Sequence, residues 1–160
     1  MKILTFDIED WFHILDNEST KSLKQWSNFD SRIQLGMELI YDILEASEKS
    51  ATFFVVGWMA EKYPEIIREI SDRGYEIGSH THLHQLAYEQ DRKTFYCDVE
   101  RSIKTLEDCT GKKVSSFRAP GFSITKKTNG LLKSYMSWVS QKIVLFSQPE
   151  ERMVACHPIM

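Results

Sequence analysis

Two histidines spaced four residues apart, His80 and His84, have the types and spacing that can grip one metal ion. Side chains at positions i and i+4 meet on one helical turn, and a strand that runs into a turn can bring them together in the same way. Taken alone, such a pair is more often structural or simply exposed. His82, which lies between them, receives no role, because a supporting or surface position explains it better than metal ligation.

Three carboxylates, Asp7, Glu9 and Asp10, crowd together near the start of the chain. Carboxylates this close repel one another, and either a bound cation or full exposure to water relieves the repulsion. Full exposure is a poor explanation beside Phe6 and Trp11. Two imidazoles and one carboxylate also leave a metal position open for water, which metal-assisted hydrolysis requires. The set suits zinc best, with cobalt, iron or manganese as alternatives.

A third feature is Arg118, which precedes Ala119 and a rigid Pro120-Gly121 turn. A guanidinium at the end of a strand can hold a carboxylate through a bidentate fork. An ordinary arginine before a turn is an equally good interpretation of this segment alone.

The elements that must position these side chains follow from hydrophobic periodicity and turn residues. Strands and helices alternate, which predicts parallel strands joined by crossover helices and an active-site face at the carboxyl ends of the strands. An aromatic-rich loop over 11–30 interrupts this rhythm. The expected strands are 2–6, 51–56, 75–78, 114–118 and one near 153–156, and the expected helices are 32–48, 58–62, 64–73, 93–108 and 131–142.

The 160 residues fit a single domain over 1–160, with ordinary globular composition (42% hydrophobic, 27% charged). The net charge of −3 argues against a nucleic-acid binder, which needs a basic surface. No run is apolar enough to span a membrane and no signal-peptide core is visible, so we expect a cytoplasmic protein. Cys97 and Cys109 should lie about 18 Å apart on one helix and, like Cys156, stay reduced.

Three segments in order resemble the motifs of the polysaccharide deacetylases, the NodB-homology domain of carbohydrate esterase family 4. They are Thr5-Phe6-Asp7, His80-Thr81 with His84, and Arg118-Ala119-Pro120. The resemblance covers residues 2–126 and is greatest to a subgroup tied to bacterial exopolysaccharide loci. It implies an α/β fold, an incomplete and distorted (β/α) barrel with parallel strands. It also implies a metal-dependent hydrolase that removes N-acetyl groups from a polysaccharide or oligosaccharide, with Asp7 as the catalytic base, the two histidines as ligands and Arg118 holding the base at low pKa.

Two departures from the family pattern leave alternatives open. The second acid is displaced, so the carboxylate ligand is Glu9 or Asp10, and alternation along an extended chain slightly favours Glu9. Residues 127–160 are too few for the later family motifs, so we expect this region to be divergent or truncated. Val154-Ala155-Cys156-His157-Pro158 is similar to the last motif, which would make His157 the general acid, although chance explains a His-Pro there equally well. A small cyclic-amide amidase and a metal-binding but inactive remnant are the alternative functions.

Overall fold

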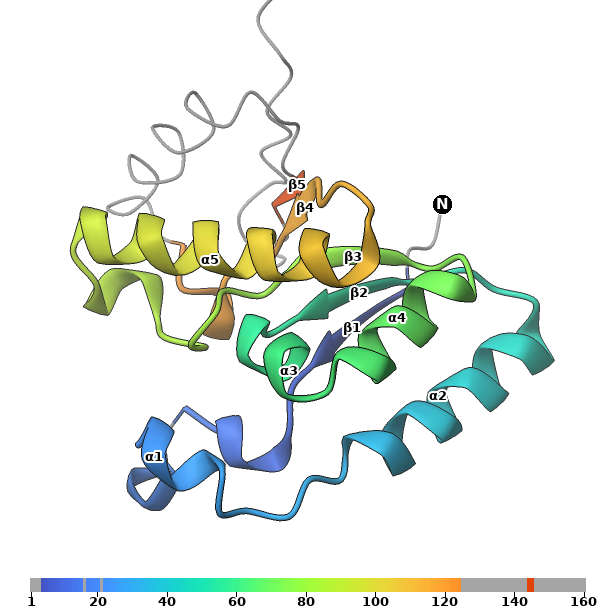
Figure 1. Cartoon of the computed structure of the whole chain (residues 1–160), viewed down its shortest axis with the longest axis horizontal. Helices are drawn as coiled ribbons and strands as arrows, with labels where there is room; N and C mark the ends of the chain where they lie inside the picture. Colours follow the sequence, from blue (N-terminus) through green and yellow to red (C-terminus); the bar gives the residue numbers. More distant parts are fainter. Residues whose placement is uncertain (1–3, 16, 21, 125–143, 146–160) are drawn as a thin grey trace, which may run out of the picture.

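A computed structural model describes residues 4–15, 17–20, 22–124 and 144–145 of the chain (Figure 1). It contains a parallel sheet with strand order β1-β2-β3-β4-β5. Within these residues β1 and β5 form opposite edges, so the sheet is open, as expected of an incomplete barrel. The strands are β1 (Thr5–Ile8), β2 (Thr52–Val55), β3 (Glu76–Ser79), β4 (Ser116–Phe117) and β5 (Val144–Leu145).

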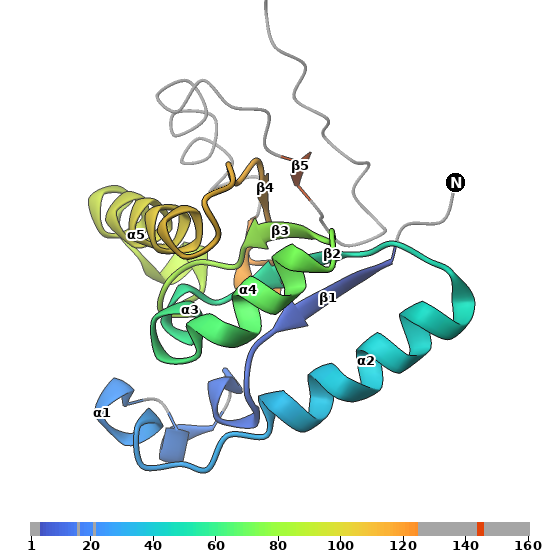
Figure 2. The same ribbon diagram turned by 45° about the vertical axis from the view of Figure 1, so that its right-hand side comes forward.

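The helices follow the strands in the predicted rhythm, and α2, α4 and α5 run beside the sheet (Figures 1 and 2). The α-helices are α1 (Leu23–Trp26), α2 (Ile33–Ser47), α3 (Gly57–Lys62), α4 (Pro64–Asp72) and α5 (Arg92–Thr110). Short 3₁₀ helices occupy Trp11–His13 (η1), Glu18–Thr20 (η2), Ala87–Glu89 (η3) and Pro120–Phe122 (η4), so the predicted loop over 11–30 is partly helical. In the described part of the chain, no helix is both long and apolar enough to cross a membrane.

Alternation along the strands separates a helix-covered face from a second face. Phe53 and Val55 of β2 are fully buried and share one core cluster with Met37 of α2, Ile67 of α4 and Leu106 of α5. Successive strand residues point to opposite faces of a sheet, so Phe54 belongs to the second face. The register pairs Phe54 with both Asp7 and Gly78. Asp7 therefore lies on the face away from the helices.

The first strand begins and ends later than its hydrophobic run suggested. The prediction was a buried strand over 2–6, whereas β1 spans Thr5–Ile8 and includes Asp7. Pairing with β2 fixes this register, with Thr5 opposite Thr52 and Ile8 opposite Val55. A carboxylate is tolerated inside the strand because its face of the sheet carries other polar side chains, including Glu76, which accepts hydrogen bonds from Thr52 and Ser116.

Several sequence predictions fall outside the described residues. These are the helix over 131–142, the strand near 153–156, Cys156 and the candidate acid His157. The pairing of β5 with β4 was not predicted from the sequence. Cys97 and Cys109 both lie on α5 as free thiols, as expected.

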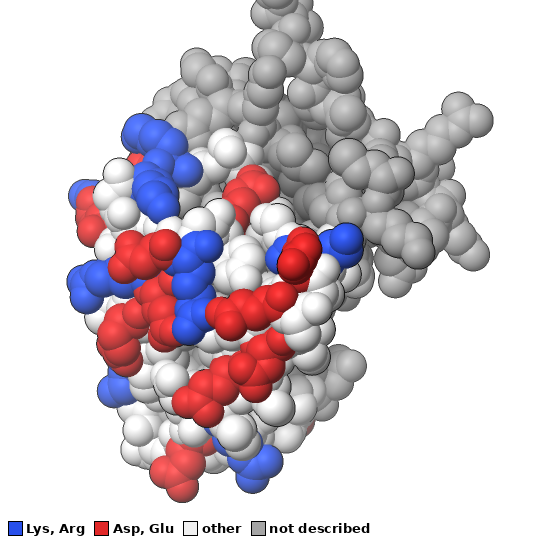
Figure 3. Space-filling model, turned by 90° about the vertical axis from the view of Figure 1, so that its right-hand side faces the viewer, with Lys and Arg blue, Asp and Glu red and all other residues white. Residues whose placement is uncertain are grey.

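On the face of the molecule seen in Figure 3, acidic side chains (red) and basic side chains (blue) lie interspersed, and the acidic ones cover the larger area. Nucleic-acid backbones are bound by continuous basic surfaces. This face, as far as the structure describes it, has no such surface.

Candidate metal centre

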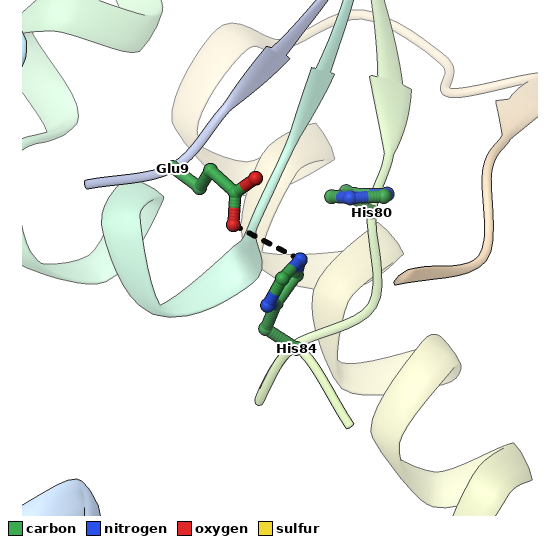
Figure 4. A group of neighbouring side chains, drawn as sticks. All are labelled: Glu9, His80 and His84. Carbon is green, nitrogen blue, oxygen red and sulfur yellow. Dashed lines mark ion pairs between the residues drawn. The ribbon is translucent and has the colours of Figure 1, made fainter. Parts of the chain in front are cut away.

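The candidate site lies where three parallel strands end. Glu9 follows β1, His80 follows β3, and Arg118 follows β4. Because the carboxyl ends of parallel strands meet at one edge of the sheet, residues distant in sequence converge there. Figure 4 shows Glu9 and the two histidines approaching one another from these strand ends.

Glu9, His80 and His84 each offer a ligand atom, and these atoms all lie within 4.8 Å of one another. Nε2 of His84 lies 3.0 Å from Oε2 of Glu9 (Figure 4). His80 and His84 are buried, whereas the Glu9 side chain keeps 33% of its surface exposed. The cluster is thus held in place by the protein on one side and open on the other.

Hydrogen bonds fix which ring nitrogen of each histidine is free. Nδ1 of His80 lies 2.7 Å from the carbonyl oxygen of Arg118, and Nδ1 of His84 lies 3.0 Å from that of His13. A carbonyl only accepts, so each Nδ1 carries the proton and each Nε2 keeps a lone pair. Burial, as the largest cause, lowers the pKa of both rings to about 4. Both are neutral at pH 7, the state that metal ligation needs.

The carboxylate of this cluster is costly to ionise without a cation. Burial, and next the neighbouring charge of Asp7, raises the pKa of Glu9 to about 7. A positive ion beside it would favour the ionised form. Two neutral imidazoles, one carboxylate and an open side form the donor set of a hydrolytic divalent-metal site. The residues present therefore fit such an ion.

Asp10, the alternative carboxylate ligand, is engaged elsewhere. Its Oδ1 accepts the N–H of Trp11 at 2.9 Å and its Oδ2 accepts that of Arg32 at 3.0 Å, while the Ser31 hydroxyl also donates to it. The N–H of Asp10 in turn donates to Nδ1 of His13 at 2.8 Å, completing a capping box. Of the two acids left open by the sequence, Glu9 joins the histidines and Asp10 caps η1 and the start of α2.

Arg118 reaches from the end of β4 across the sheet to β1. Its Nη1 donates to Oδ1 of Asp7 at 2.6 Å and its Nη2 donates to Oγ1 of Thr5 at 2.7 Å. Its guanidinium carbon lies 4.3 Å from the ring centre of Phe54, which belongs to β2, one of the two strands between β4 and β1. The predicted bidentate fork is wrong in this respect: one arm holds Asp7, and the other holds Thr5, which lies on the same face two residues earlier.

Asp7 stands next to the metal donors and stays partly open. Its Oδ2 is 3.8 Å from Nε2 of His80, and 30% of its side-chain surface is exposed. Burial raises the pKa of the Asp7 carboxyl overall, while the charge and hydrogen bond of Arg118 pull it down. The expectation that Arg118 keeps this pKa low is therefore wrong in net direction. A carboxylate with raised proton affinity is better suited to act as a base near neutral pH.

The donors open into a cavity of about 390 Å³, whose lining includes Asp7, Glu9, His80 and His84. A second cleft of about 460 Å³ adjoins it at His84, and its lining includes Phe12 and Trp26 as well as Leu83 and Gln90. Volumes in this range accommodate a ligand of the size of one or two sugar rings. In the described part of the chain, a ligand of this size therefore has access to the donor atoms.

The turn that carries both histidines is tightly constrained. Thr81 and His84 have positive φ angles of 63° and 53°, which side-chain-bearing residues rarely adopt. The hydroxyl of Thr81 accepts the N–H of His84 at 3.1 Å. On the α3 side, the N–H of Gly57 donates to the carbonyl of Thr81 at 2.8 Å and that of Trp58 donates to the carbonyl of His82 at 3.1 Å.

At Gly57 the helix α3 packs closely against this turn. A Cβ there would lie 2.5 Å from Nδ1 of His82 and 3.0 Å from Cα of Ser102. Gly57→Ala should therefore destabilise the protein by roughly 1–3 kcal/mol, as overpacking in a core does. Gly36→Ala is the matched control, because a Cβ at Gly36 has no neighbour within 4 Å. Because Gly36 lies inside the helix α2, Gly36→Ala should leave the free energy of unfolding unchanged or raise it by about 0.5–1 kcal/mol. Urea unfolding of both variants checks this, and a Gly57→Ala protein at least as stable as the wild type would contradict it.

Two residues near the site escaped the sequence interpretation. His13 supplies the carbonyl that orients His84, and Asp98 of α5 accepts two N–H groups from the histidine turn. A backbone carbonyl leaves no trace in a sequence. Asp98 is visible in the sequence as a charged residue that interrupts the apolar face formed by Phe95, Val99 and Leu106.

The chain belongs to the polysaccharide deacetylase family, whose model matches residues 17–136. The match includes His80, His84 and Arg118 and begins after Asp7 and Glu9.

Three known proteins illustrate the relationship. The chain is 26% identical to a peptidoglycan deacetylase of Helicobacter pylori over 62% of its own length and 34% of the relative's. It is 27% identical to chitin deacetylase 1 of Saccharomyces cerevisiae over 79% of its length and 41% of the relative's. A crystal structure described as a polysaccharide deacetylase of Mycobacterium smegmatis aligns with a TM-score of 0.69 and 27% identity, over 83% of this chain and 47% of that one. The chain thus spans less than half the length of these relatives.

Proposed function

We propose that this chain carries the metal-binding and base-bearing part of a polysaccharide deacetylase, which hydrolyses the N-acetyl amide of an amino sugar. The observation that carries the proposal is the convergence of Glu9, His80 and His84 beside Asp7 and its partner Arg118. The relatives named as peptidoglycan and chitin deacetylases support this class of reaction.

The proposed ligands are Nε2 of His80, Nε2 of His84 and the carboxylate of Glu9. Zinc suits this set best, and cobalt, iron and manganese are the alternatives. A divalent cation held there would act as a Lewis acid toward the acyl oxygen and lower the pKa of water. The histidines arrive neutral and oriented by the carbonyls of Arg118 and His13, so no proton has to leave the rings when the ion binds.

Asp7 is the proposed general base. It takes a proton from the attacking water as the water oxygen bonds to the acetyl carbon, and Arg118 holds its other oxygen in place. Breaking the carbon–nitrogen bond then yields acetate and an amine, which needs one proton. His157 remains the predicted donor of that proton, and it lies outside the described residues.

The proposed substrate is an N-acetylated polysaccharide or oligosaccharide. The cavity at the donor atoms and the cleft that adjoins it at His84 leave room for sugar rings. The open carboxylates Asp7 and Glu9 offer acceptors to hydroxyl and amide groups.

The purified, zinc-loaded chain should release acetate from N-acetylglucosamine oligosaccharides, and a chelator should stop the release. Acetate is measured by an enzyme-coupled assay, with small cyclic ureides offered in parallel. Hydrolysis of the ureides alone would favour a cyclic-amide amidase instead. Zinc binding with no turnover of any substrate would favour a metal-binding but inactive protein. Either result would overturn the proposed reaction, whereas acetate release that zinc restores after chelation would support it.

A further inference from the structure

Asp98 is a carboxylate on the buried face of α5, with 7% of its surface exposed. Its Oδ2 accepts the backbone N–H of His82 at 2.7 Å, and its Oδ1 accepts that of Leu83 at 3.1 Å. Both oxygens are therefore directed at consecutive amides of the turn between the two candidate ligand histidines. Asp98 takes no part in the proposed donor set, in which Glu9 supplies the carboxylate.

The turn needs such a partner because its backbone is unfavourable on its own. Thr81 and His84 both sit in the left-handed region, and residues with side chains persist there only when the surroundings hold them. The N–H groups of His82 and Leu83 are part of this backbone, and a buried amide without an acceptor is costly. A charged acceptor makes shorter and stronger hydrogen bonds than a neutral one.

The turn is held from two sides. Its carbonyl groups at Thr81 and His82 accept from the first amides of α3, at Gly57 and Trp58, while its N–H groups go to Asp98 on α5. The helices α3 and α5 also pack on each other, and Arg101 of α5 pairs with Glu61 of α3 at 3.0 Å. Without the Asp98 carboxylate, no other contact among the described residues would hold the N–H groups of His82 and Leu83 in this direction.

We propose that Asp98 is the positioning residue of the metal centre: by accepting these two amides it sets the separation of the His80 and His84 rings. The inference rests on the proposed function, since it concerns the same ligands. Asparagine cannot replace the aspartate fully, because its side chain offers one acceptor oxygen and turns an NH₂ group toward the second amide. The ligands themselves are untouched by this change.

The test is Asp98→Asn in the full chain, titrated with Co²⁺, whose visible absorption reports ligand number and geometry. We expect affinity to fall about 10- to 100-fold, as for other groups that orient metal ligands, and the spectrum at saturation to change. In the metal-free protein, the amide protons of His82 and Leu83 should exchange faster. Asp108→Asn, an exposed aspartate on the same helix, is the matched control and should leave all three readouts at the wild-type values.

The outcomes separate the two proposals. A wild-type chain that binds no cobalt overturns the metal centre and the role of Asp98 together. A wild-type chain that binds cobalt while Asp98→Asn matches it in affinity and spectrum overturns the role of Asp98 alone. Should Asp98→Asn fail to fold, Asp98→Glu is measured in its place, because it keeps both acceptor oxygens but alters their reach. A changed spectrum then supports the proposal, and an unchanged one overturns it.

Discussion

Replacing His80 with alanine should abolish stoichiometric binding of zinc or cobalt by the purified chain. The substitution removes one of two imidazoles whose Nε2 atoms are left free by hydrogen bonds at Nδ1. The remaining donors, His84 and Glu9, are two ligands where catalytic zinc sites use three protein ligands. Metal content after dialysis, measured by elemental analysis, should fall from one ion per chain to near zero.

His82→Ala is the control for this experiment. It removes an equally buried imidazole from the same turn, and its ring nitrogens have no hydrogen-bond partner among the described residues. Both variants should lose stability through the space they leave, and His82→Ala should still bind one ion. Wild-type metal content in a folded His80→Ala protein would refute the assigned ligands.

The edge of the sheet where the site lies was predictable because parallel strands align their carboxyl ends. Hydrophobic runs located β2 and β3 to within about one residue. The polar residues that follow β1, β3 and β4 then had to meet at the carboxyl edge of the sheet. Choosing Glu9 over Asp10 rested on alternation alone. Glu9 is the acid that lies with the two histidines in the structure, and its role as a ligand stays a prediction. The pairing of Arg118 with Asp7, 111 positions apart, came from the family resemblance rather than from any local pattern.

Other features depended on tertiary contacts that no local pattern contains. The start of β1 is set by register with β2, so the hydrophobic run at 2–6 misplaced it. Asp10 was indistinguishable by type from a ligand, and its hydrogen bonds with Trp11, Ser31 and Arg32 show that it acts as a cap. The guanidinium of Arg118 donates to both Asp7 and Thr5 because these two residues lie on the same face of β1. A prediction made from the end of β4 alone does not reveal that Thr5 is within reach.

The proton affinity of Asp7 is a further case in which the balance of two effects decided the outcome. From sequence, the arginine was the visible influence and implied a lowered pKa. In the structure burial is the larger influence and raises the pKa, although the side chain is 30% exposed and screened accordingly. The resulting arrangement is an oriented carboxylate, beside the metal donors, that holds a proton more readily than a free aspartate.

Asp7→Asn should keep the metal and lose turnover. In the wild-type protein, Nη1 of Arg118 donates to Oδ1 of Asp7 at 2.6 Å. The asparagine side chain has nearly the same shape, and its amide oxygen can still accept this hydrogen bond. It has no basic oxygen to take the proton of the attacking water, and loss of a general base slows catalysis by about 10²–10⁴-fold. We expect kcat for acetate release to fall by this amount, with one ion per chain retained.

The comparison that isolates this role is Asp42→Asn, an exposed aspartate on α2, outside the cavity lined by the metal donors. It makes the same chemical change and should leave kcat and metal content unchanged. If Asp7→Asn kept its metal and turned over at the wild-type rate, Asp7 would not be the base. If it lost both metal and turnover, Asp7 would be acting as a ligand rather than as a base. Only retained metal with lost turnover matches a carboxylate that lies 3.8 Å from Nε2 of His80 and is held by Arg118.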